Sequence, residues 1–157
     1  GSSIGNFSPD GAVALLKQVR AASRGGALLI GVDAKKTKAR LDAAYADALG
    51  VTAAFNLNAL RHINRVVGAG FIEAHWRHAG FYNEAKGRIE MHLEAICEET
   101  IHLDGAKRSF LPGERIHSEN SYKYARGEFE ALLRASGYAR SQVWSNAGEE
   151  FWVFLAR

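Results

Sequence analysis

The sequence predicts an α/β fold with parallel strands in its central sheet, and three observations indicate it. Residues 1–50 show the order strand end, helix, strand, helix, which is typical of a doubly wound sheet. Residues 125–157 show an amphipathic helix followed by two strands. Residues 51–124 break this alternation, which indicates a region of different architecture between the two.

The N-terminal segment is expected to be the end of a buried strand that runs into a turn, because Ile4 and Phe7 flank a Gly-Asn pair. A helix over residues 8–23 follows. Ser8 suits its N-cap and Pro9 suits its first position. A pair of glycines then ends it.

Residues 27–33, "ALLIGVD", form a continuous apolar run, which predicts a strand buried on both faces of a parallel sheet. The crossover rule makes it the parallel neighbour of the N-terminal strand. It ends on Asp33, at the edge where such sheets place ligand-facing groups. A helix over residues 39–50 is expected next, ended by Gly50.

In the middle, residues 52–68 have helical spacing, and residues 75–87 are expected to be irregular. Residues 88–96 alternate between apolar and polar side chains, which predicts a half-buried antiparallel strand. Residues 97–104 continue or pair with it. A Pro-Gly turn then leads into "RIHSENSYKY", residues 115–124, which is too polar for an ordinary buried strand.

Near the C-terminus, residues 125–138 form an amphipathic helix that Gly137 ends. Residues 140–146 and 149–157 are predicted to be two strands of a hairpin.

Composition limits the classes of function. The 157 residues are 47% hydrophobic and 24% charged, with a net charge of +3 and a pI near 9.1, so one soluble globular chain is expected. The basic residues are scattered apart from residues 35–40, which argues against a nucleic-acid partner. A single cysteine, Cys97, excludes an internal disulfide and fits a cytoplasmic setting. No apolar run has the ~20 residues of a membrane span, and no signal peptide is recognised.

Five segments together resemble the histidine-specific N-alpha-methyltransferases. They are, in chain order, "GSSIGNF", "AYADALGVTAAFNLNAL", "NRVVGAGF", "RIEMHL" and "IHSENSYKY". Enzymes of this family use S-adenosyl-L-methionine to trimethylate the amine of L-histidine, giving hercynine, the betaine that begins ergothioneine biosynthesis. The resemblance implies a Rossmann-like methyltransferase core, residues 1–36 and 124–157, and a substrate-binding α+β insertion, residues 37–123.

The resemblance also implies that this chain is the C-terminal portion of the enzyme and is inactive alone. The glycine-rich loop and acidic residue that bind the adenosine ribose precede these segments in the family. In "VVGAGF" the two glycines follow a helix, which is the wrong context for a nucleotide-binding loop. Cofactor-binding residues are therefore expected mostly outside this sequence. Self-association, or pairing with the N-terminal half, is a further expectation.

The family motifs imply roles for five residues. Asn6 and Tyr45 would bind the amine and carboxylate end of the amino acid, and Met91, Glu119 and Ser121 would surround its side chain. No catalytic acid or base is assigned. A carboxylate suits an imidazole N–H, a serine hydroxyl can serve the other ring nitrogen, and residues two apart on a strand face the same way.

Each residue also has a structural interpretation. Asn6 could serve its own turn, Tyr45 and Met91 could pack in a core, and Glu119 and Ser121 could lie on the surface. The histidines show no metal-ligand spacing completed by Cys, Asp or Glu, so no metal is expected. Alternative functions are an N-methyltransferase for another aromatic amino acid and a non-catalytic small-molecule-binding fragment.

Overall fold

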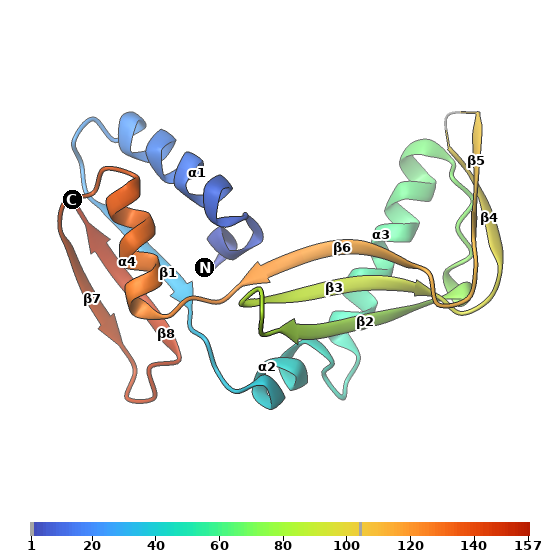
Figure 1. Ribbon diagram of the computed structural model, residues 1–157. Helices are drawn as coiled ribbons and strands as arrows, with labels where there is room; N and C mark the ends of the chain where they lie inside the picture. The colour runs from blue at the N-terminus through green and yellow to red at the C-terminus, as the bar shows by residue number, and fades with distance from the viewer. Residues whose placement is uncertain (1, 104) are drawn as a thin grey trace. The chain divides into compact units, whose positions relative to one another are not determined.

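The structure is a computed structural model that describes residues 2–103 and 105–157. Gly1, where the expected N-terminal strand end begins, and Asp104, at the end of the strand expected over 97–104, lie outside the described residues. The chain divides into two compact units (Figure 1). Unit 1 contains Gly1–Thr37, Asn83–Arg88 and Asn120–Arg157, and unit 2 contains Lys38–Tyr82 and Ile89–Glu119.

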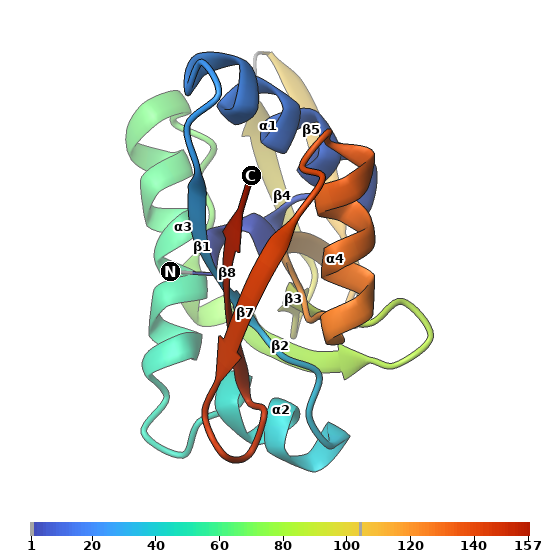
Figure 2. The same ribbon diagram turned by 90° about the vertical axis from the view of Figure 1, so that its left-hand side faces the viewer.

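Unit 1 is built on a three-stranded sheet in the order β1-β8-β7 (Figure 2). Its strands are β1 (Leu28–Asp33), β7 (Ser141–Ser145) and β8 (Phe151–Ala156). Both pairings are antiparallel, and the register of β1 runs from Leu28↔Ala156 to Asp33↔Phe151. The predicted C-terminal hairpin is therefore confirmed.

Helices α1 (Pro9–Ala22) and α4 (Arg126–Ala135) pack against each other in unit 1. The predicted N-cap of α1 is confirmed, because the Ser8 hydroxyl accepts a hydrogen bond from the Gly11 N–H at 3.2 Å. One apolar core joins the helices to the sheet. Its fully buried members include Leu16, Phe129 and Phe154.

Two predictions for unit 1 are wrong. The segment expected to end a strand is a 3-10 helix, η1 (Ser3–Asn6), so it gives β1 no parallel partner among the described residues. β1 is also not buried on both faces, since Leu29 is 67% exposed. The continuous apolar run predicted the strand correctly, but Leu28 and Ile30 pack against the core whereas Leu29, on the other face, does not.

In its described residues, unit 2 contains two α-helices, a 3-10 helix and two small sheets. The helices are α2 (Lys38–Tyr45), α3 (Val51–Val67) and η2 (Glu73–His75). The strands are β2 (Trp76–Asn83), β3 (Arg88–Ala95), β4 (Glu99–Leu103), β5 (Ala106–Phe110) and β6 (Arg115–Tyr122). One sheet has the order β2-β3-β6 and the other is the antiparallel pair β4-β5. One end of each of these three strands belongs to unit 1, namely Asn83 of β2, Arg88 of β3 and residues 120–122 of β6.

Three predictions for unit 2 are corrected. Residues 75–87 are not irregular, because most of them form β2. The helix expected over 39–50 ends at Tyr45. Asp47 causes the break, since its carboxylate accepts hydrogen bonds from the N–H groups of Val51 and Thr52 at 2.8 and 2.9 Å and caps α3.

The third correction concerns β3, which is not half-buried. Glu90 and Glu94, expected on its solvent face, are both buried. Glu94 is bound by the guanidinium groups of Arg77 and Arg115, and these hydrogen bonds lower the pKa of its carboxyl group. Because arginines on the neighbouring strands β2 and β6 pair with Glu94, its charged carboxylate can be buried.

Unit 2 has two apolar clusters. One includes Leu60, Trp76 and Leu93, and the other consists of Leu41, Tyr82, Ile89 and Met91. Among the described residues, no helix has the length and apolar character needed to cross a membrane.

Candidate functional site

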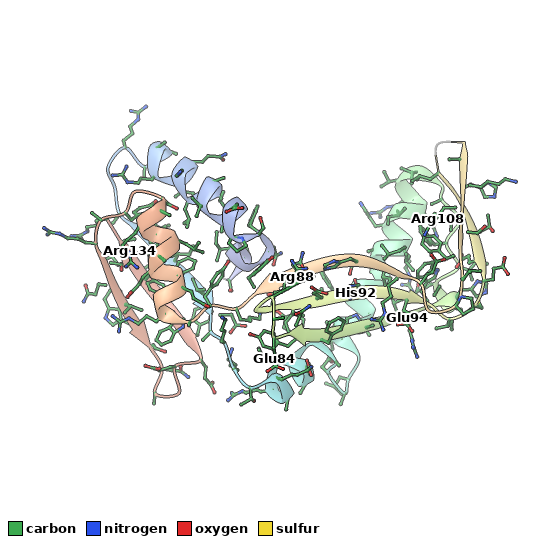
Figure 3. The ribbon with its side chains drawn as sticks, in the orientation of Figure 1. Glu84, Arg88, His92, Glu94, Arg108 and Arg134 are labelled. Atoms are coloured by element: carbon green, nitrogen blue, oxygen red, sulfur yellow. The ribbon has the colours of Figure 1, made fainter. Side chains whose placement is uncertain are left out.

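Glu119 and Ser121 both belong to β6, and residues two apart on an extended strand are expected to face the same way. Glu119 is half-buried and Ser121 is 8% exposed. His117, two residues before Glu119 on β6, identifies the face of the sheet on which Glu119 is expected. The ring of His117 stacks on the ring of His92 from β3, with centroids 4.5 Å apart. Figure 3 shows His92 and Glu94 on β3.

A buried lysine fixes the chemistry of Ser121. In unit 1 the Lys123 ammonium lies 2.8 Å from the Ser121 hydroxyl and 2.8 Å from Asp33 Oδ2. The Lys123 side chain is only 2% exposed. An ammonium group can only donate, so the Ser121 oxygen is the acceptor in this bond and its own O–H can donate elsewhere. Sequence reasoning missed Lys123, although it had placed Asp33 at a ligand-facing strand end.

The negative charge of the Asp33 carboxylate compensates the positive charge of the buried Lys123 ammonium group. Burial raises the pKa of its carboxyl group, but hydrogen bonds from Lys123 and Lys36 outweigh this effect, and the net pKa is lowered. The Asp33 backbone N–H also donates to the Ser2 hydroxyl at 2.9 Å. The end of β1 is thereby tied to the turn that carries Asn6.

That turn lies against the end of β6. Gly5 is buried, and a Cβ atom there would lie 2.7 Å from the Tyr122 carbonyl oxygen and 3.6 Å from Ser121 Oγ. Only glycine permits such a close approach of the two backbones. Asn6 follows Gly5 directly and is exposed. Within unit 1, the structure therefore brings the Asn6 turn next to Ser121.

Tyr45 and Met91 meet in unit 2. Met91 is 4% exposed and packs with Leu41, Tyr82 and Ile89, and the half-buried Tyr45 packs against this cluster. The core-packing interpretation of Met91 matches these surroundings. Its role in a ligand pocket stays a prediction.

The β2-β3-β6 sheet separates Met91 from Glu119. Met91 is the neighbour of His92 on β3, so their side chains point to opposite faces. Glu119 is two residues from His117 on β6 and shares the face on which His117 stacks with His92. Tyr45 and Met91 thus belong to one face of the sheet, and Glu119 belongs to the other.

A polar network that sequence reasoning missed holds the end of α2. The His78 ring lies with Nε2 2.8 Å from the Tyr45 carbonyl oxygen and Nδ1 2.9 Å from the Asn56 amide nitrogen. A carbonyl oxygen only accepts, so Nε2 carries the proton and Nδ1 accepts from Asn56. The Asn56 amide also donates to the His92 carbonyl oxygen at 3.0 Å. Both nitrogens of His78 therefore serve the fold and position Tyr45.

A family model described as "Histidine-specific methyltransferase, SAM-dependent" matches residues 1–157. The chain belongs to this family. It is 36% identical over 99% of its length to a histidine N-alpha-methyltransferase from Mycobacterium tuberculosis, of which it covers 50%.

Two further relatives differ in their described roles. The chain is 37% identical over its whole length to ergothioneine biosynthesis protein 1 from Neurospora crassa, of which it covers 18%. It is 29% identical, again over its whole length, to an L-tryptophan methyltransferase from Psilocybe serbica, of which it covers 45%. The chain therefore spans about half or less of the length of these relatives.

Proposed function

We propose that the chain is the C-terminal part of an S-adenosyl-L-methionine-dependent enzyme that methylates the alpha-amine of L-histidine to give hercynine. The family match over residues 1–157 and the histidine N-alpha-methyltransferase from Mycobacterium tuberculosis support this assignment. In this proposal residues 1–36 and 124–157 belong to the methyltransferase core, and residues 37–123 form the substrate-binding insertion.

The Glu119–Ser121 pair is the observation that carries the choice of histidine. A carboxylate accepts a hydrogen bond, and the Ser121 hydroxyl, which accepts from Lys123, is directed to donate. One acceptor and one donor match a neutral imidazole, which has one N–H and one lone pair in its ring plane. An indole ring has an N–H but no lone pair in its ring plane, so it cannot accept a hydrogen bond from Ser121. In this proposal, that ring-nitrogen lone pair distinguishes histidine from an indole substrate.

The other three residues have supporting roles in the proposal. Asn6, in the turn held next to Ser121, would bind the amine and carboxylate end of the substrate with an uncharged amide. Tyr45 and Met91 lie on the other face of the β2-β3-β6 sheet from Glu119, so in this proposal they do not share its contact with the imidazole, and their roles rest on the family motifs alone.

Positioning supplies most of the catalysis in this mechanism. S-adenosyl-L-methionine provides an activated methyl group, and the substrate amine must be neutral and aligned with it. The residues of this chain would hold the imidazole and the carboxylate so that the amine points in one direction. No side chain is assigned as the base that removes the amine proton.

The test is the turnover of histidine by the protein that contains this chain. Glu119→Gln should lower kcat/KM for histidine by roughly 10- to 150-fold, because a charge-assisted hydrogen bond contributes about 1.5–3 kcal/mol. Ser121→Ala should lower it less, and tryptophan should gain relative to histidine in both variants. Glu98→Gln, an exposed glutamate, is the matched control.

Unchanged histidine turnover in Glu119→Gln would overturn the substrate assignment. It would favour the alternative, an N-methyltransferase for another aromatic amino acid, which the likeness to an L-tryptophan methyltransferase keeps open. Binding of histidine without any methyl transfer would instead favour a non-catalytic binding module.

A further inference from the structure

Three potential metal ligands converge on the β2-β3-β6 sheet. Glu90 and His92 on β3 and His117 on β6 each offer a ligand atom, and these atoms all lie within 4.8 Å of one another. Glu90 is buried, and the His92 side chain is 12% exposed. Their positions in sequence gave no recognised ligand spacing, because β3 and β6 are brought together only by the sheet.

The hydrogen bonds of His117 leave a nitrogen suited to coordination. His117 Nε2 lies 3.2 Å from the Glu119 carbonyl oxygen, which can only accept, so Nε2 carries the proton. In the neutral ring, Nδ1 then keeps its lone pair. Histidines that ligate metals usually donate their other ring N–H to a carbonyl or carboxylate in this way.

His92 also has a ring nitrogen without a hydrogen-bond partner among the described residues. This nitrogen is the buried Nδ1, whereas Nε2 is the nitrogen that lies 3.9 Å from Glu90 Oε2. Burial lowers the pKa of His92, and the neighbouring His117 adds to the shift. The ring of Phe81 stacks on His92 with centroids 5.4 Å apart and restricts its orientation. His92 therefore presents an imidazole in a fixed position.

The charges around the cluster are compatible with a cation. Glu90 contributes a carboxylate, whose Oε2 lies 3.9 Å from His92 Nε2. The nearby guanidinium of Arg115 is bound to Glu94 at 2.6 Å, and Arg77 binds the same carboxylate. Arg115 and Arg77 thus share one anion, Glu94, and Glu90 is the carboxylate of the cluster.

We propose that Glu90, His92 and His117 form a binding site for a divalent transition-metal ion, with Zn²⁺ as the best match. Two imidazoles and one carboxylate make a known zinc ligand set that leaves a fourth position for water. With zinc–ligand bonds of about 2.0–2.2 Å, tetrahedral coordination places donor atoms roughly 3.3–3.6 Å apart, so the cluster, whose ligand atoms lie within 4.8 Å of one another, must contract. The His92 and His117 rings are stacked with an inclination of 28°, so the exposed His117 must turn out of this stack to direct its in-plane lone pair at the ion.

The site would also affect the neighbouring Glu119. The His117 ring is hydrogen-bonded to the Glu119 backbone, so an ion that holds His117 restricts the segment of β6 that carries Glu119. This restriction of β6 follows from the positions of His117 and Glu119 and does not require the proposed methyl transfer.

The test is metal binding by the protein that contains this chain, after removal of metals with a chelator. Zn²⁺ titration followed by calorimetry should show one equivalent of ion that His117→Gln loses or binds at least roughly tenfold more weakly. Co²⁺ should give the visible absorption of a four-coordinate site, and the same variant should abolish it. His62→Gln, which replaces an exposed histidine on α3, should leave both measurements unchanged.

His117 is exposed, so its replacement should leave the fold intact, and circular dichroism of the variant checks this. Equal Zn²⁺ affinity in the unchanged protein and in a folded His117→Gln variant would overturn the proposal. Equal Co²⁺ spectra in these two proteins would do the same.

Discussion

The two units bury their interiors in different ways. Unit 1 has one apolar core between its sheet and two helices. Its buried Lys123 ammonium group lies beside the Asp33 carboxylate. Unit 2 splits its apolar residues into two clusters and also buries polar and charged groups, namely Asn56, Glu90, Glu94 and Glu99. Unit 1 therefore depends mainly on apolar packing, whereas unit 2 depends also on meeting each buried polar group with a partner.

The largest effect is expected from a cavity in the core of unit 1. Phe129 is fully buried, and its ring lies 5.3 Å from Tyr124 and 5.0 Å from Phe154 between centroids. Phe129→Ala should lower the free energy of unfolding of unit 1 by about 3–5 kcal/mol. Hydrogen exchange followed by mass spectrometry should show faster exchange in peptides from α1, α4 and β8. Unchanged exchange in those peptides would contradict a single shared core.

A smaller effect is expected from one buried hydrogen-bond acceptor in unit 2. The Glu99 carboxylate accepts from the Ile72 backbone N–H and from the Trp76 indole N–H, both at 2.6 Å. Glu99→Gln cannot offer an acceptor to both donors, so it should destabilise unit 2 by roughly 1–3 kcal/mol.

The measurement is exchange in peptides from β2 and β4, with exposed Glu98→Gln as the matched control. Equal exchange in the Glu99 and Glu98 variants would show that unit 2 does not rely on this buried carboxylate.

The smallest effect on stability is expected from lowering the pH. Asp33 in unit 1 has a pKa below its usual value, and Asp47 in unit 2 has a pKa lowered to about 2, first of all by the Thr52 backbone hydrogen bond. A lowered folded-state pKa stabilises the protein above the unfolded pKa of about 3.9, and this contribution is lost as the pH falls through the folded value. Stability should thus decline below about pH 4 in both units.

Asp33→Asn should reduce the decline in β1 peptides, and Asp47→Asn should reduce it in peptides from the start of α3. The comparison is hydrogen exchange at about pH 5 and about pH 3, corrected for the intrinsic rate. Identical pH dependence in a variant and the unchanged protein would show that the carboxylate in question does not contribute.

Sequence patterns predicted most of the helices and strands, but not which of their faces are buried. The capped helix α1, the apolar strand β1 and the C-terminal hairpin follow from local signals and are confirmed. Residues 75–87 gave no strand pattern because β2 carries Trp76, Arg77 and His78 in succession, and their partners come from elsewhere in unit 2. The five predicted site residues came from family motifs, and their roles stay predictions.

The sequence by itself determined the family and the helices and strands with strong local signals, because these depend on neighbours in the chain. Only the tertiary structure placed Lys123 between Asp33 and Ser121, and only it gathered Glu90, His92 and His117. Hydrogen bonds and metal ligation act over a few ångströms of space. They join residues that are far apart in sequence, and no local pattern records such contacts.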